Sequence, residues 1–263
     1  FPSSSCTFNF APMSTLPSEF AKPAVILFLA RTISRRENKK KGMLELFRTL
    51  VLILPIVGLV GTSNLSTAVI ILGIAVILVF VSSPFYLPFV GLFGAGAGFM
   101  GIFLGLESYR LERIAIWRDP ESYEKGFQTI QGLYAIGSGG LFGTGLGGSI
   151  QKLGFVPEAQ NDMIFSIICE ELGLVGAGIL LLLFLMLIWR FFLVSVHAPD
   201  LFGSLIAAGV MGHISIQVIL NVAVVTNTIP NTGITLPFVS YGGTSILFLL
   251  AEMGLVLGIS RKC

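Results

Sequence analysis

The sequence predicts an all-α polytopic membrane protein, and three observations support this fold class. The 263 residues are 54% hydrophobic and only 11% charged, whereas a soluble domain carries about 25% charged residues. Apolar runs of about 20 residues recur along the chain, and this is the length that crosses the hydrocarbon core as a helix. The runs are continuous and do not alternate with polar residues, so they predict helices and not the strands of a membrane barrel.

We expect about seven membrane-spanning helices, all within one membrane domain that covers residues 1–263. Their approximate bounds are 17–34, 46–61, 65–81, 85–106, 163–189, 201–225 and 236–259. The last span contains Pro237 and the pair Gly242-Gly243. Proline and paired glycines at membrane depth predict a broken or kinked segment that lines protein or a cavity.

Positive charge sets the expected topology. The densest cationic cluster lies between the first two spans, and the positive-inside rule places it in the cytoplasm. It comprises Arg31, Arg35, Arg36, Lys39, Lys40, Lys41 and Arg48. A net charge of +2 gives no reason to expect a nucleic-acid partner. Alternation of the spans then makes residues 107–162 a large extracytoplasmic loop, which is long enough to indicate a functional role.

Asp162 lies at the end of this loop, directly before a long apolar segment. A carboxylate at the boundary between water and membrane is costly to desolvate and needs a physical reason. One interpretation is a cap at the positive end of a helix, and the other is a functional acid. For Glu158, Glu170 and Glu171 we expect structural or supporting roles.

Further charged residues have both a structural and a functional interpretation. Glu19 and Lys22 lie three positions apart, so they either pair with each other or line a polar cavity. Arg110, Arg113 and Arg118 lie in the outer loop, against the positive-inside trend. A guanidinium suits phosphate oxygens, and pairing of these arginines with nearby acids or lipid headgroups is the alternative.

A glycine-rich run covers residues 137–148. Residues 143–148 match the dinucleotide-binding pattern G-x-G-x-x-G literally, but no strand–helix unit of a soluble domain surrounds them. The glycines form either an amide nest for an anion or tight loop packing. The three cysteines predict neither a disulfide framework nor a metal site. We interpret His197 as a cytoplasmic loop residue and His213 as a packed or pore-facing polar group.

Five segments resemble, in the same order, the SEDS (shape, elongation, division and sporulation) family of bacterial cell-wall synthases, the FtsW, RodA and SpoVE group. Each segment alone is weak evidence, but together they are specific and span nearly the whole chain. They are Leu-Pro-Ser-Glu-Phe-Ala-Lys at 16–22, Asn-Leu-Ser-Thr-Ala at 64–68, the run 131–148 around Ala-Ile-Gly-Ser-Gly-Gly, residues 157–173 ending in Glu-Glu-Leu-Gly, and residues 236–245 around Pro-Phe-Val-Ser-Tyr-Gly-Gly.

The chain departs from the family pattern at a few positions. Leu16, Asn64 and Gly132 stand where Gln, Asp and Ser are common, and Gln160-Asn161 replaces a common His-Thr pair. The acid at position 162 is retained. Residues 64–68 and 251–254 are more similar to FtsW and SpoVE than to RodA, while a role in division, elongation or sporulation stays open.

The resemblance implies a ten-helix fold in which the seven spans are helices four to ten. We therefore expect the sequence to be N-terminally truncated, with three helices and a Gly-Ala-x-x-Trp segment preceding it in the full protein. A truncated fragment without activity of its own is one alternative that this leaves open.

The resemblance further implies a peptidoglycan glycosyltransferase of the bacterial plasma membrane that polymerises lipid II during division or sporulation. The family's essential acid maps onto Asp162, the expected general base. The expected substrate-binding residues are Lys22, Glu19, Arg110, Arg113, Arg118, Gln131 and Ser138. We expect no dedicated protein metal site, although a divalent cation such as Mg²⁺ or Mn²⁺ would suit the leaving pyrophosphate.

Lipid II, membrane lipid and a class B penicillin-binding protein are the expected partners, and no nucleic acid is expected. Two other functions are compatible with the same sequence features. A lipid II flippase would also use a polar cavity between glycine-rich helices, but it needs no general base. A non-catalytic scaffold that recruits a penicillin-binding protein would need Asp162 for folding alone.

Overall fold

The computed structural model of the chain describes residues 16–35, 53–82 and 108–263. The predicted span 85–106, the first part of the predicted span 46–61 and most of the cationic cluster lie outside these residues. Within the described ranges every regular element is a helix, and this confirms the all-α prediction. Among the residues that the structure describes, four helices are long and apolar enough to cross a membrane, namely α4, α8, α9 and α10.

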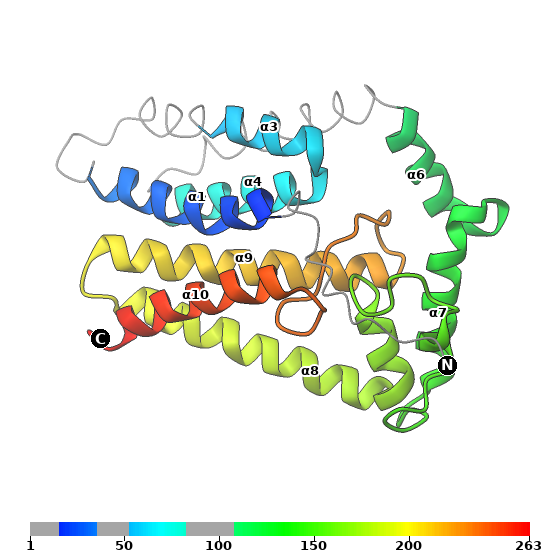
Figure 1. Cartoon of the computed structure of the whole chain (residues 1–263). Coiled ribbons are helices and arrows are strands. Elements are labelled where there is room, and N and C mark those ends of the chain that lie inside the picture. Colours follow the sequence, from blue (N-terminus) through cyan, green and yellow to red (C-terminus); the bar gives the residue numbers. More distant parts are fainter. Residues whose placement is uncertain (1–15, 36–52, 83–107) are drawn as a thin grey trace, which may run out of the picture.

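The bundle is organised around α9 (Leu201–Val225), which packs against α8, α4, α1 and α10 (Figure 1). The bounds of the other bundle helices are α1 Leu16–Ser34, α3 Leu54–Ser63, α4 Leu65–Ser82, α8 Ile164–His197 and α10 Gly243–Ser260. The side chain of Asp200 caps α9, because its Oδ2 accepts a hydrogen bond from Gly203 N at 3.1 Å.

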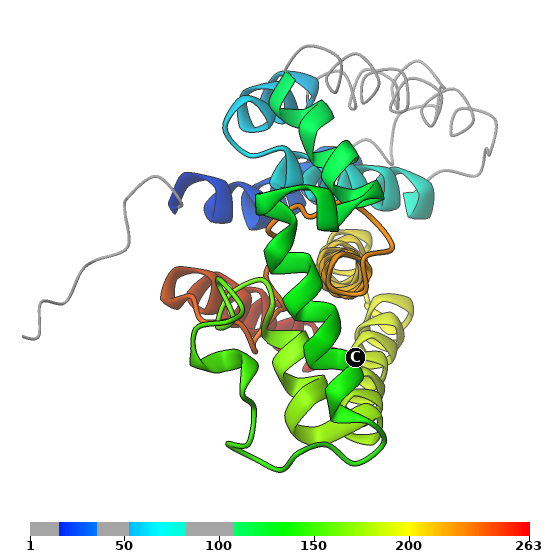
Figure 2. The ribbon, with the colours of Figure 1, turned by 90° about the vertical axis from the view of Figure 1, so that its right-hand side faces the viewer.

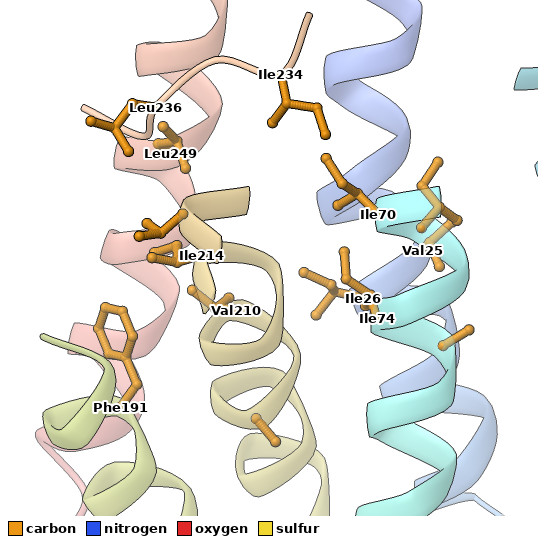
Figure 3. Close-up of a cluster of buried hydrophobic side chains, with 14 of the residues drawn as sticks. Val25, Ile26, Ile70, Ile74, Phe191, Val210, Ile214, Ile234, Leu236 and Leu249 are labelled. Atoms are coloured by element: carbon orange, nitrogen blue, oxygen red, sulfur yellow. The ribbon is translucent and has the colours of Figure 1, made fainter. Parts of the chain in front are cut away.

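Aliphatic side chains fill the space between the helices. Figure 3 shows Val25 and Ile26 of α1 beside Ile70 and Ile74 of α4, all buried. At Gly209 of α9 an added Cβ would lie only 2.7 Å from the Ile26 side chain. A small residue at this position therefore lets α1 approach α9 closely, as is usual between membrane helices.

α8 is longer than the predicted span 163–189 and contains a break. Gly173 has φ 68° and ψ −172°, which is not helical. A Cβ at this position would meet Gly143 N at 2.4 Å, so the break needs glycine. The part after the break, residues 174–197, is about 36 Å long. This part alone is long enough to cross the hydrocarbon core, so the turns before Gly173 are not needed for the crossing.

The predicted outer loop contains two helices, α6 (Ser108–Arg118) and α7 (Phe127–Gly139), joined by short 3₁₀ turns. In Figure 2, where α9 is seen nearly end on, α7 runs lengthwise across the view. It lies across one end of the bundle and packs against α8. We call this end of the molecule the cavity end.

The glycine-rich run packs against the beginning of α8. The amide of Thr144 donates to the carbonyl of Glu170 at 2.9 Å, and Gly145 N donates to the carbonyl of Glu171 at 3.0 Å. These N–H groups are therefore used within the fold. The structure favours the packing interpretation of the run over an amide nest for an anion.

The last helix begins later than expected. α10 starts at Gly243, whereas the predicted span starts at residue 236. Residues 226–242 form a connection of turns and extended backbone, which we call the α9–α10 connection. Within it the Ser240 hydroxyl accepts from Leu236 N at 2.7 Å, and Phe238 has φ 62°. The predicted interruption is present, but it lies before the helix and not inside it.

Candidate functional site

Asp162 lies in the turn just before α8 and is 8% exposed. It lines a cavity of about 420 Å³ at the cavity end of the bundle. The walls come from α6, α7, the turn before α8 and the α9–α10 connection. The lining residues are Glu112, Arg113, Ile116, Trp117, Glu124, Phe127, Gln128, Thr129, Pro157, Asp162, Asn227, Asn231 and Gly233.

The surroundings of Asp162 favour its protonated form. Burial, with a smaller contribution from the charge of Glu158, raises the pKa of the Asp162 carboxyl from an ordinary 3.8 to about 6. Hydrogen bonds from the backbone N–H groups of Asp162 and Met163 and from the Gln128 amide lower this pKa by less. The Gln128 bond joins Nε2 to Asp162 Oδ1 at 3.4 Å.

Helix capping alone does not account for Asp162. The residue that flanks α8 as its N-cap is Met163, and α8 begins without a side-chain cap hydrogen bond. The carboxyl instead faces a cavity, and its pKa lies closer to neutrality than that of a solvated carboxyl. This combination is typical of functional acids.

Two side chains of α6 tie that helix to the α9–α10 connection. Arg113 Nη1 donates to the carbonyl of Asn231 at 3.1 Å, and Trp117 Nε1 donates to the carbonyl of Asn227 at 2.9 Å. Arg113 also lines the cavity, and its contact with substrate stays a prediction. Arg118 is exposed and does not line the cavity, and the backbone of Arg110 lies in α6, three residues before Arg113.

The α9–α10 connection is also tied to the turn that carries Asp162. Asn221 Nδ2 donates to the carbonyl oxygens of Asp162 at 2.8 Å and Ile234 at 2.6 Å. The Ser240 hydroxyl donates to the carbonyl of Asn161 at 2.6 Å. At Gly233, with φ +66°, a Cβ would come within 3.9 Å of Asp162 Oδ2. The connection thus forms the wall next to the acid.

Glu19 and Lys22 form an ion pair on α1. Lys22 Nζ lies 2.9 Å from both carboxylate oxygens of Glu19, and Lys22 is 3% exposed. Neither residue lines the cavity that contains Asp162. The structure supports the pairing interpretation, and contact with substrate stays a prediction.

The other predicted polar residues lie near α7 or the start of α8. Gln131 and Ser138 are in α7 but do not line the cavity, and the Ser138 hydroxyl donates to the carbonyl of Ala135 at 3.0 Å. Their contact with substrate also stays a prediction.

Glu170 and Glu171 have the structural contacts expected of them. Glu170 accepts hydrogen bonds from the Ser149 hydroxyl and, at 3.1 Å, from Ile150 N. Glu171 pairs with Lys152 at 2.6 Å. Both acids anchor the loop that follows α7 to the first turns of α8.

Sequence reasoning missed Gln128, Asn231 and Trp117 as cavity residues, and Asn221 as the residue that holds the Asp162 carbonyl. Asn221 carried a usable indication, because a polar side chain inside an apolar span usually has a functional or packing role. In the described ranges no three His, Cys, Asp or Glu side chains lie close enough to hold a metal ion.

The fold and the site define a multi-pass membrane protein with a buried acid at a polar cavity. Comparison with known proteins gives the particular family. Residues 4–263 match the model of the FtsW, RodA and SpoVE family, described as cell cycle proteins. The chain belongs to this family.

Individual relatives support this assignment. The chain is 43% identical over 262 residues to stage V sporulation protein E of Bacillus subtilis, with 94% of this chain and 69% of that protein covered. It is 34% identical over 259 residues to a probable peptidoglycan glycosyltransferase FtsW of Geobacter sp. strain M18, with 97% of this chain and 69% of that protein covered. These names confirm, for the family, the predicted enzyme class and the predicted role in cell-wall synthesis.

Solved structures show the same fold. A structure that describes polymerisation and crosslinking by a peptidoglycan synthase complex matches with a TM-score of 0.78 and 31% identity, covering 94% of this chain and 70% of that chain. RodA of Thermus thermophilus matches with a TM-score of 0.63 and 30% identity, covering 93% and 65%. The identity to stage V sporulation protein E, 43%, is higher than the identity to this RodA, 30%. This difference agrees with the predicted similarity to FtsW and SpoVE.

Proposed function

We propose that this chain contains the catalytic region of a peptidoglycan glycosyltransferase that polymerises lipid II, with Asp162 as the general base. The observation that carries the proposal is a carboxyl that is 8% exposed, has a pKa of about 6 and lines a polar cavity. Family membership supports the reaction class, and the cavity that Asp162 lines supports its location.

The chemistry is a substitution at a sugar carbon. The hydroxyl oxygen of the acceptor sugar attacks the anomeric carbon of the donor, and a glycosidic C–O bond forms. The bond from that carbon to the pyrophosphate oxygen breaks, undecaprenyl pyrophosphate leaves with the bonding electrons, and the hydroxyl proton passes to Asp162. General base catalysis of this kind contributes about 10²–10⁴-fold to a rate.

The pKa of Asp162 suits this role. A base works best when its pKa lies near the working pH, since it is then both ionised and a good proton acceptor. A pKa of about 6 leaves Asp162 mostly ionised near neutrality, yet makes it more basic than a carboxylate in water. Proton release to solvent through the cavity completes the cycle.

Negative charge develops on the leaving pyrophosphate and needs a cationic partner. Arg113 lines the same cavity as Asp162, and a guanidinium matches phosphate oxygens. We assign charge neutralisation to Arg113. A Mg²⁺ or Mn²⁺ ion bound to the substrate's pyrophosphate would neutralise further charge on the leaving group.

The similar structure of a peptidoglycan synthase complex that coordinates polymerisation and crosslinking supports the choice of partner. We propose a class B penicillin-binding protein as the crosslinking partner of this chain. Membrane lipid surrounds the apolar helices, and the cavity end faces the side where cell wall is built.

The decisive experiment measures lipid II polymerisation by the full-length protein together with its transpeptidase. Asp162→Asn, which keeps the size of the side chain, is expected to abolish glycan strands. Asp119→Asn is the matched control, because Asp119 is exposed, lies outside the cavity and bonds Ser122. Equal rates for Asp162→Asn and wild type would remove Asp162 from catalysis. Lipid II transport without polymer from either protein would instead support the flippase function.

A further inference from the structure

A column of buried polar side chains runs along α9 to the Asp162 turn. His213, Gln217 and Asn221 follow one another at intervals of four residues, which places them on one face of the helix. Each is at most 2% exposed. His213 Nδ1 lies 2.8 Å from Oε2 of Glu252, a buried residue of α10. We call these four residues the α9 column.

The column is linked to the walls of the cavity through Gln217 and Asn221. Gln217 Nε2 donates to the carbonyl of Thr235 at 3.0 Å. One turn further along, Asn221 Nδ2 holds the carbonyl oxygens of Asp162 and Ile234 together. The Asp162 turn and the α9–α10 connection both form walls of the site. Asn221 bonds both of them, so the orientation of its amide affects how these two segments meet.

Each member of the column has one buried polar atom without a hydrogen-bond partner among the described residues. These atoms are His213 Nε2, Gln217 Oε1, Asn221 Oδ1 and Glu252 Oε1. Two are amide oxygens and one is a carboxyl oxygen, so what they need is mainly a hydrogen-bond donor. Leaving such groups unpaired inside a membrane helix bundle is costly.

The spacing of the column matches bridging by water. The Cβ atoms of residues four apart on a helix are separated by about 5–6 Å, so the polar atoms of neighbouring members can be reached by one molecule between them. Two hydrogen bonds of about 2.8 Å through one water molecule span a similar distance. A buried water needs two or more polar partners, and successive members of the column offer them.

We propose that the α9 column binds buried water molecules and that these make Gln217 and Asn221 positioning residues for Asp162. Water donors at Asn221 Oδ1 and Gln217 Oε1 hold both amides in the orientation in which their NH₂ groups face the backbone carbonyls. The column thereby sets the position of Asp162 relative to the α9–α10 connection. The positioning role rests on the proposed function, while the water site does not.

The first test is a structure of the full-length wild-type protein at a resolution that shows ordered water. Density within hydrogen-bond distance of both Gln217 Oε1 and Asn221 Oδ1 is expected. A column that is dry, or that is filled by apolar side chains from the rest of the protein, would overturn the proposal whatever the protein's activity.

The second test is kinetic. Gln217→Met has a similar size but neither donates nor accepts, and it is expected to lower kcat for lipid II polymerisation about tenfold. KM should stay within about twofold, because the variant misplaces the base and leaves the cavity walls to bind substrate. Ser215→Ala is the control, since the Ser215 hydroxyl bonds Met211 O of its own helix.

The melting temperature and the folded fraction are measured alongside the rates. A fall in kcat with the folded fraction unchanged supports positioning. Loss of folded protein in proportion to activity would show a purely structural role, and an unchanged kcat would exclude positioning. Inactive wild-type protein with ordered water in the column would refute the proposed function and leave the water site standing.

Discussion

The Gln128 side chain of α7 donates a hydrogen bond to Asp162 Oδ1 across 3.4 Å, although the two residues are separated by 34 positions in the chain. This bond joins the helix that lies across the bundle to the acid at the start of α8. It favours the ionised carboxyl and partly offsets the burial that raises the pKa of Asp162.

The pH dependence of polymerisation should report the ionisation of Asp162. The pKa of about 6 predicts that kcat/KM is nearly constant above pH 7 and falls about tenfold per pH unit well below pH 6. Initial rates between pH 4.5 and 8 measure this limb. If kcat/KM instead begins to fall only near pH 4, Asp162 is solvated in the working enzyme.

Replacing Gln128 by methionine should raise the pH at which kcat/KM falls. The variant keeps the volume of the side chain but loses the donor to Asp162 Oδ1, so the pKa of Asp162 rises. Because the bond is long, we expect a shift of only about 0.5 pH unit. Thr129→Val, a neighbouring change at the cavity, provides the comparison, and a limb that moves equally in both variants would contradict a specific role for Gln128.

Asp162→Asn should stabilise the protein at neutral pH. With a folded-state pKa of about 6 and an ordinary value of 3.8, the folded state favours protonated Asp162. Its contribution to stability is fully present below about pH 4 and is lost as the pH rises to about 6. Above that, ionised Asp162 costs up to about 3 kcal/mol.

Asparagine does not ionise and avoids this cost, so the free energy of unfolding should be higher for the variant at pH 7.5 and similar at pH 4. Unfolding in detergent micelles at both pH values checks this. An Asn variant that is less stable than wild type at pH 7.5 would show that the carboxylate is stabilised in the fold. A gain in stability together with a loss of activity is expected where a functional site is strained.

Gly173→Ala should destabilise the break in α8 and its packing against the glycine-rich run. The residue has φ 68°, and a Cβ would lie 2.4 Å from Gly143 N. We expect a loss of about 2 kcal/mol or more, since both the backbone conformation and the contact exclude a side chain. Gly178→Ala is the matched control, because a Cβ there meets nothing within 4 Å and the position is helical. Equal melting temperatures for the two variants would contradict the break at Gly173.

Several helices could be read from the sequence because their limits are local. The predicted span 201–225 coincides with α9, since Asp200 caps its start and the polar residues that follow Val225 end it. The start of α10 was predicted seven residues too early. Ser240 and Tyr241 bond the carbonyls of Asn161 and Gln160, and these contacts hold an apolar stretch out of the helix.

The sequence by itself determined the class of the protein, its family and the acid on which the proposed mechanism depends. Lipid allows few solutions for a chain so poor in charge, and an acid that borders an apolar span is visible locally. Only the tertiary structure decided what surrounds that acid. Gln128, Arg113 and Asn231 reach the cavity of Asp162 from three separate segments. Hydrogen bonds and packing between distant segments, which no local pattern encodes, bring them together and set the pKa of the carboxyl.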